Sequence, residues 1–139
     1  MIEFVYTALA ATGFKHPLHP VMTHIPMGMV IGAFLFQTAS FRWEELSKTA
    51  HHCIVMAFIF IPPTVLFGYM DWKHRYAGYL SSIIIAKIIL ATVLFILIST
   101  ELYLYRKGMT DKKFTAILYT LNLFTAAGLG FFGGQLIFG

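Results

Sequence analysis

Apolar residues fall into four long runs along the chain, separated by short polar segments. Each run is close to the roughly 20 residues that an α-helix needs to cross about 30 Å of hydrocarbon. Short connections between long helices favour antiparallel neighbours. We therefore predict an all-α integral membrane protein, a four-helix up-and-down transmembrane bundle forming one domain over residues 1–139, with spans at about 21–41, 53–70, 79–104 and 114–138.

The first 15 residues are also apolar, but this segment is too short to span a membrane. It carries Glu3 and lacks the basic start of a signal peptide. We expect a short interfacial segment that lies along the membrane surface or packs against a partner subunit.

Composition agrees with a lipid-embedded chain. Of the 139 residues, 58% are hydrophobic and 12% are charged, whereas about a quarter of the residues in a soluble domain are charged. The net charge of +4 comes from short loops, so it does not indicate a nucleic-acid partner. The single cysteine, Cys53, cannot form an intramolecular disulfide and is interpreted as a core residue.

Basic residues predict the orientation, because cytoplasmic loops carry an excess of lysine and arginine. The first and third loops are richer in basic residues than the opposite side. We therefore expect a multi-pass protein of the cytoplasmic (inner) membrane with both termini on the periplasmic side. The basic residues of the first and third loops are Arg42, Lys48, Arg106, Lys107, Lys112 and Lys113. Those on the opposite side are Lys15, Lys73 and Arg75.

A histidine above two glycines marks the first span. His24, Gly28 and Gly32 are four residues apart and share one helix face. The glycines could form a contact for a neighbouring helix, with the histidine hydrogen-bonding across the interface. Alternatively, they could leave space for a porphyrin whose iron is ligated by the imidazole.

A b-type haem needs two axial ligands facing each other across an apolar slot, with basic groups near its propionates. His24 is the best candidate for one ligand, and His74, His19 or His16 could supply the second. His51 and His52 are adjacent, point about 100° apart on a helix, and cannot clasp one iron. The proposed slot is lined by Gly28, Gly32, Gly130 and Gly134, and the propionates could meet Lys87, Lys73 or Arg75.

Other chemistry has less support in the sequence. Histidines mixed with Met22, Met27 and Met29 could suit Cu(I), although methionines in apolar helices usually pack. Asp71 could orient a histidine or take up a proton beside a quinone, but an ion pair with Lys87 or Arg75 is the favoured interpretation. No residues are arranged for hydrolysis or phosphate binding.

Several motifs together resemble a family of small polytopic bacterial membrane proteins known only as a domain of unknown function. They are Leu18-His19-Pro20, His24-Ile25-Pro26-Met27-Gly28, Gly68-Tyr69-Met70-Asp71-Trp72 and the C-terminal Gly133-Gly134-Gln135-Leu136-Ile137-Phe138-Gly139. The resemblance covers nearly the whole chain. It implies a place in membrane electron transfer, because such proteins are found joined to cytochrome or iron–sulfur modules. Family members often carry a histidine in the third span, where this chain has Lys87 at the nearest position.

The sequence therefore predicts a redox-carrier or anchor subunit rather than a stand-alone enzyme. In the favoured interpretation, it holds haem b near the periplasmic face and relays electrons between quinone and redox partners, such as other membrane or periplasmic subunits. A cofactor-free membrane anchor is the first alternative, and a copper-handling membrane protein is the second.

Overall fold

The computed structural model describes residues 2–109 and 111–138, and over these residues the chain is entirely helical, with five helices and no strand. Four of the helices are long and apolar enough to cross a membrane, which makes this a membrane protein with four candidate spans. The helices are α1 (Ile2–Ala11), α2 (Leu18–Ala39), α3 (Leu46–Tyr76), α4 (Ser82–Arg106) and α5 (Lys112–Phe138).

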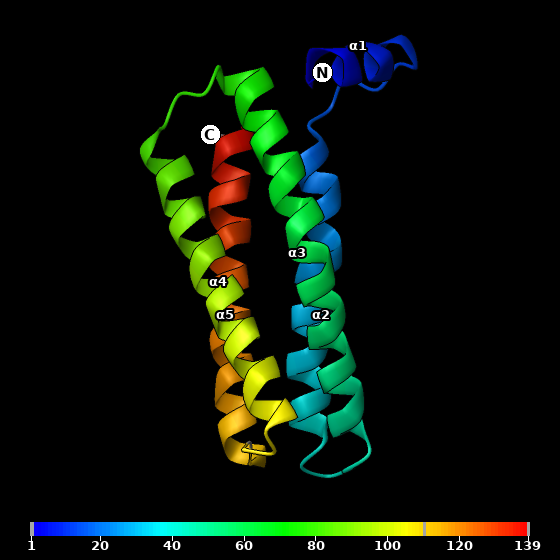
Figure 1. Cartoon of the computed structure of the whole chain (residues 1–139), viewed down its shortest axis with the longest axis vertical. Helices are drawn as coiled ribbons and strands as arrows, with labels where there is room; N and C mark the ends of the chain where they lie inside the picture. Colours follow the sequence, from blue (N-terminus) through cyan, green and yellow to red (C-terminus); the bar gives the residue numbers. More distant parts are fainter. Residues whose placement is uncertain (1, 110, 139) are drawn as a thin grey trace.

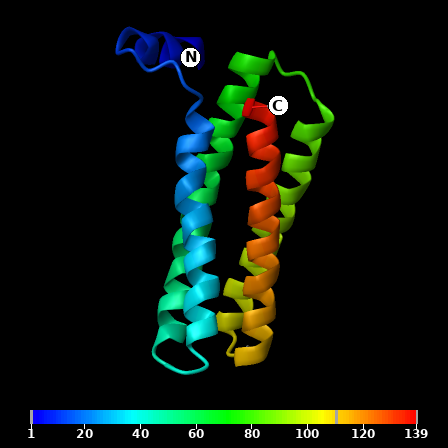
Figure 2. The same ribbon diagram turned by 180° about the vertical axis from the view of Figure 1, so that it is seen from behind.

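The four long helices lie side by side, and consecutive ones are joined at alternate ends of the molecule (Figures 1 and 2). Helix α2 packs most extensively against α3 and also contacts α5, which in turn packs against α4. Helix α1 lies across one end and contacts α3. We call this end, which also holds the end of α5, the terminal end, and we call the opposite one the far end.

Helix α3 extends well beyond the expected span. The segment 73–76, which lies beyond the expected span at 53–70, forms the last turn of the helix. Cationic side chains near a helix C-terminus interact favourably with the backbone dipole. The helix ends where Ala77 and Gly78 adopt positive φ angles of 48° and 75°, and the Gly78 N–H bonds to the Trp72 carbonyl at 3.2 Å.

Side-chain caps define the starts of the last two long helices. The Ser81 hydroxyl accepts a hydrogen bond from the Ile84 N–H at 3.3 Å, and the Asp111 carboxylate accepts one from the Phe114 N–H at 2.6 Å. Each cap pairs one of the backbone donors that a helix start leaves free. Helix α2 differs, because Pro17 stands at its N-cap position and provides no side-chain acceptor.

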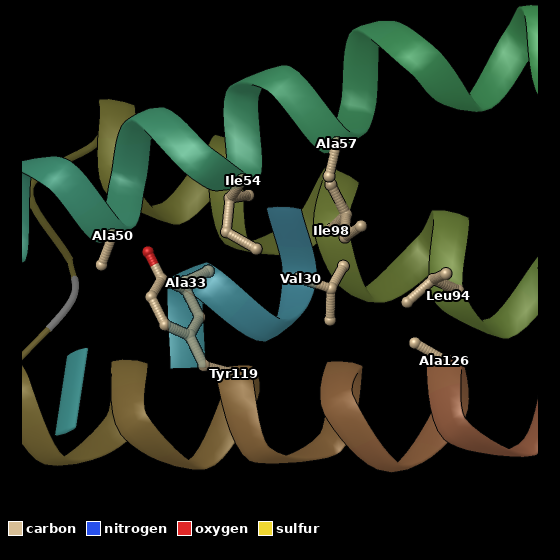
Figure 3. Packing of buried hydrophobic residues seen from close by; sticks show 9 residues of the cluster. All are labelled: Val30, Ala33, Ala50, Ile54, Ala57, Leu94, Ile98, Tyr119 and Ala126. Carbon is tan, nitrogen blue, oxygen red and sulfur yellow. The ribbon is translucent and has the colours of Figure 1, made fainter. Parts of the chain in front are cut away.

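Small and branched side chains form the buried core, with contributions from all four long helices (Figure 3). Ala33, Ala50 and Ala57 are fully buried and let α2 and α3 approach each other closely. In lipid, such close packing replaces the hydrophobic driving force that folds soluble bundles. The remaining members of the cluster are Val30, Ile54, Leu94, Ile98, Tyr119 and Ala126.

Candidate functional site

Asp71 of α3 supplies the cap that α2 lacks. Its carboxylate accepts hydrogen bonds from the backbone N–H groups of Leu18 at 3.1 Å and His19 at 2.7 Å. It also accepts one from the Tyr6 hydroxyl of α1. Because its side chain is 5% exposed, these partners replace water at a buried charge. We call Tyr6, Leu18, His19 and Asp71 the Asp71 cluster, and it joins three helices at the terminal end.

This arrangement corrects the interpretation of Asp71 as one half of an ion pair. Over residues 2–109 and 111–138, the ion pairs join His74 to Glu3 and Lys112 to Glu44. Arg75 instead donates to the Lys15 carbonyl at 2.6 Å. The unpaired backbone N–H groups at the start of α2 donate the hydrogen bonds that stabilise the carboxylate, since an anion is favoured at a helix N-terminus.

The side chain of His19 points into the bundle against α3. Its Nδ1 lies 3.0 Å from the Thr64 carbonyl oxygen, a bond that this nitrogen makes as the donor. Gly68 leaves the space that the ring occupies, because a Cβ at that position would lie 2.9 Å from Nδ1. The glycine of the Gly68–Trp72 motif therefore accommodates the histidine of the Leu18–Pro20 motif.

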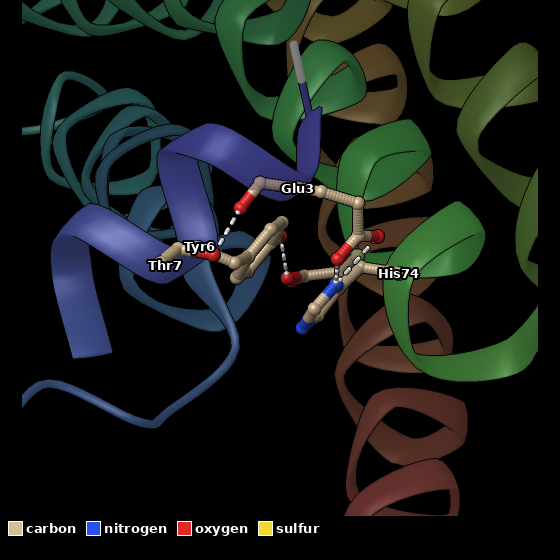
Figure 4. Close-up of polar contacts among 5 residues, drawn as sticks. Glu3, Tyr6, Thr7 and His74 are labelled. Atoms are coloured by element: carbon tan, nitrogen blue, oxygen red, sulfur yellow. Dashed lines mark hydrogen bonds and ion pairs between the residues drawn. The ribbon is translucent and has the colours of Figure 1, made fainter.

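His74 takes part in a second polar group on the surface of the terminal end (Figure 4). Its ring stacks on Tyr6 with centroids 4.0 Å apart, and its Nδ1 lies 3.0 Å from a Glu3 carboxylate oxygen. Burial, reinforced by the hydrogen bond to Asp71, raises the pKa of Tyr6 well above its usual range, so this phenol remains a donor. These contacts anchor α1 on α3.

The structure separates the two histidines of the first span. His24 is exposed on the outside of α2, and its Nδ1 lies 2.5 Å from the Pro20 carbonyl oxygen. Five helical residues correspond to about 140° of rotation, so the inward side chain of His19 requires His24 to point away from the core. His16 is also exposed, with its ring at the edge of Phe14. The two α2 histidines therefore cannot face each other across one iron.

The four glycines of the expected slot have different surroundings. A Cβ at Gly28 or Gly134 would meet nothing within 4 Å, whereas one at Gly32 would lie 3.5 Å from Cys53 Sγ. A Cβ at Gly130 would lie 3.3 Å from the Met27 methyl carbon. Gly130 and Gly134 line a shallow depression of about 420 Å³ on α5, together with Phe131, Gln135 and Phe138.

Lys87 is half-buried and directed toward α5, as expected for a lysine avoiding lipid. Its Nζ lies 3.5 Å from the position that a Cβ on Gly133 would occupy. Within the part of the chain that the structure describes, no group of three or more histidine, cysteine, aspartate or glutamate side chains could hold a metal ion.

A polar group that was not among the predicted sites lies toward the far end. Glu101 of α4 is 1% exposed and accepts a hydrogen bond from the Asn122 side chain of α5 at 3.1 Å. This contact bridges α4 and α5. The signal for Glu101 was present in the sequence, since it is the one acidic residue between 82 and 106. His51 stacks on Tyr105 at 3.5 Å, and His52 is exposed.

A protein-family model described as a predicted membrane protein (DUF2231) matches residues 15–138. The match includes all four long helices and excludes α1. No curated protein and no solved structure matches the chain.

Proposed function

Because the chain belongs to the DUF2231 family of predicted membrane proteins, we propose that it is an electron-transfer subunit holding a b-type haem on the outward face of α2. In this proposal, the four long helices cross the inner membrane as an up-and-down bundle with both termini in the periplasm. The haem lies near the periplasmic face, where the subunit relays electrons between quinone and redox partners in a larger complex.

The supporting observation is the open surface formed by His24 and Gly28. The bond between His24 Nδ1 and the Pro20 carbonyl makes Nδ1 the protonated nitrogen, which leaves the Nε2 lone pair free for a metal. One turn further along α2, no atom lies within 4 Å of the Cβ position of Gly28. A flat group could approach the backbone there. A haem would supply one-electron chemistry at this surface.

Of the candidate second ligands in this chain, His16 is exposed and unengaged by a hydrogen bond in the described residues, so a second ligand would come from His16 or from outside the chain. His19 lies on the inner side of α2, and His74 is engaged by Glu3 and Tyr6. A second ligand from outside the chain would place the proposed haem at an interface with another copy or with a membrane or periplasmic redox subunit, such as a cytochrome or an iron–sulfur protein. His24 would hold the iron, and Gly28 would leave room for the macrocycle.

A cofactor-free anchor is the second candidate, and the Asp71 cluster favours it. The family-like motif residues His19, Gly68 and Asp71 satisfy one another without a ligand. The exposed His24 would then accept a hydrogen bond at Nε2 from a partner helix. Copper handling has less support, because Met27 packs against Gly130 of α5, whereas His24 is exposed on the outside of α2.

Removal of the His24 imidazole is expected to abolish haem binding. The protein should be purified from membranes together with any tightly bound partners, and its absorption should be recorded in the oxidised and reduced states. We expect a Soret band for the wild type and for His52→Ala, which removes an exposed histidine at the far end, and none for His24→Ala. A spectrum without a Soret band in every sample would instead support the anchor, and copper analysis of the same samples would test the third alternative.

Bulk added at Gly28 is expected to reduce haem binding while preserving the fold. A Cβ at this exposed position meets no other part of the chain, and leucine improves helix propensity over glycine by up to about 1 kcal/mol. We expect Gly28→Leu to keep its unfolding temperature but lose at least half of the bound haem, whereas Ala127→Leu, an exposed change on α5, keeps both. Unchanged haem content in Gly28→Leu would contradict placement of the macrocycle on this face.

A further inference from the structure

The carboxyl group of Glu101 is buried where the four long helices pack together. Its side chain is 1% exposed, and Asn122, on the facing helix α5, is 0% exposed. Ile98 and Tyr119, which belong to the buried core, are close to these two residues along α4 and α5 (Figure 3). A negative charge on a carboxyl group at such a place would not be solvated by water.

The hydrogen bonds of this pair leave two oxygen atoms without partners. Asn122 Nδ2 donates to Glu101 Oε2 at 3.1 Å. The other oxygen of each group, Oε1 of Glu101 and Oδ1 of Asn122, is buried and has no partner at normal hydrogen-bond geometry, although the Tyr119 hydroxyl approaches the Glu101 carboxyl group. Both atoms are acceptors if Glu101 is ionised. An ionised carboxylate would therefore leave one orphan oxygen on each side of the same contact, at the full cost of desolvation.

One proton would satisfy both oxygen atoms. A carboxylic acid protonated at Oε1 can donate to Asn122 Oδ1, while Asn122 Nδ2 continues to donate to Oε2. The acid and the amide would then form a cyclic pair with two hydrogen bonds. We infer that Glu101 is a neutral, proton-bearing carboxylic acid and that the Glu101–Asn122 pair forms a binding site for one exchangeable proton within the membrane.

The surroundings of Glu101 favour the neutral form. The ion pairs of residues 2–109 and 111–138 do not include Glu101. The titratable groups around it are Tyr119 of α5, Tyr105 of its own helix, and Cys53 and His51 of α3. Helix α2 contributes Gln37, a buried amide, to this half of the bundle. No lysine or arginine is in this set, so an ionised Glu101 would be an uncompensated buried charge.

Polar side chains connect the site with the far end. Tyr105 is one helical turn from Glu101, and the half-buried His51 stacks on it and has an Nδ1 atom with no partner. His52, the next residue of α3, is exposed. A proton from water at the far end can enter along this side and form the O–H bond at Oε1. Release returns it to water, with no change in electron count, and the haem proposal is not required for either step.

The protonated acid can be detected directly by infrared spectroscopy of the full chain in lipid vesicles. We expect a carboxylic-acid carbonyl band at pH 7 that shifts in heavy water, disappears when the pH is raised far enough to ionise the group, and is absent from Glu101→Gln. His51→Ala should keep the band but slow its shift in heavy water. Absence of the band from the wild type at pH 7 would overturn the inference.

Variants of the pair test the two hydrogen bonds independently of spectroscopy. In Glu101→Gln, the new amide can donate to Asn122 Oδ1 as the acid does, so we expect an unchanged unfolding temperature. Glu101→Leu leaves Asn122 unpaired and should unfold at least about 5 °C lower. A Glu101→Gln variant destabilised as much as Glu101→Leu would show that the native group is an ionised carboxylate.

A chemical label distinguishes Glu101 from the carboxylates at the surface. Dicyclohexylcarbodiimide is apolar and reacts with protonated carboxyl groups, so it should modify Glu101 and spare the exposed Glu3, Glu44 and Glu45. Mass spectrometry should locate the adduct on α4 in the wild type and none in Glu101→Gln. Equal labelling of Glu44 and Glu101 at pH 7 would contradict a distinct proton-binding site.

Discussion

Replacement of Asp71 by alanine is expected to lower the free energy of unfolding by about 3 kcal/mol. The change leaves the backbone N–H groups of Leu18 and His19 without acceptors and frees the Tyr6 hydroxyl. Each buried donor without a partner costs about 1–3 kcal/mol. The effect can be measured by following helix content during unfolding in detergent micelles. Protease cleavage between α1 and α2 should also accelerate, because α1 loses its buried contact.

Asp111→Ala is the matched control for this experiment. Asp111 also caps a helix with its carboxylate, but it is exposed and caps its own helix α5 through the Phe114 N–H. Loss of such a local cap typically costs about 1 kcal/mol. Asp71→Asn, which retains one acceptor oxygen, should lie between the two alanine variants. If Asp71→Ala is no more destabilising than Asp111→Ala, a cap supplied by another helix stabilises the protein no more than a cap within one helix.

Gly68→Ala is expected to destabilise the terminal end by about 2 kcal/mol, because its methyl group displaces the His19 ring. The added Cβ would lie 2.9 Å from Nδ1 and 3.1 Å from Cε1, and the ring cannot move without losing its bond to the Thr64 carbonyl. This loss exceeds the roughly 1 kcal/mol that alanine gains over glycine in a helix. Unfolding in micelles provides the measurement.

A double-mutant comparison isolates the contact. In the His19→Ala background, the ring is absent, so the additional Gly68→Ala change should be neutral or stabilising. Gly134→Ala serves as a second control, because a Cβ there would meet no atom within 4 Å. Equal destabilisation by Gly68→Ala in both backgrounds would show that something other than His19 fills this space.

The helices were predictable from hydropathy because each must bury its own backbone polar groups in lipid. The ends were less predictable, and α3 shows the reason. Apolar residues stop near Met70, yet the helix continues to Tyr76 because its final turn lies where polar side chains are solvated and cations favour the helix dipole. Hydropathy predicts which residues lie in the hydrocarbon of the membrane. The end of the helix is instead set by Ala77 and Gly78, whose φ angles are positive.

The candidate sites could be predicted only in part, because they depend on contacts between helices that the spacing of residues in the sequence does not determine. The five-residue separation of His19 and His24 implies opposite faces, but only packing determines which one points inward. Asp71 is 53 residues from Leu18, so its capping role could not be inferred from local sequence. Glu101 could have been identified as the one carboxyl group of the third span. Its pairing with Asn122 could not have been predicted from the sequence, because it depends on how α4 and α5 are aligned along each other.

The cap on α2 also constrains the order of events during synthesis. The start of α2 emerges from the ribosome long before its acceptor, and α3 must run back along α2 before residue 71 can reach residues 18 and 19. Until this helical hairpin closes, two backbone amides depend on water or lipid headgroups for partners. A nascent chain halted before residue 71 would therefore carry an unfinished first span and an N-terminal segment with no place to dock.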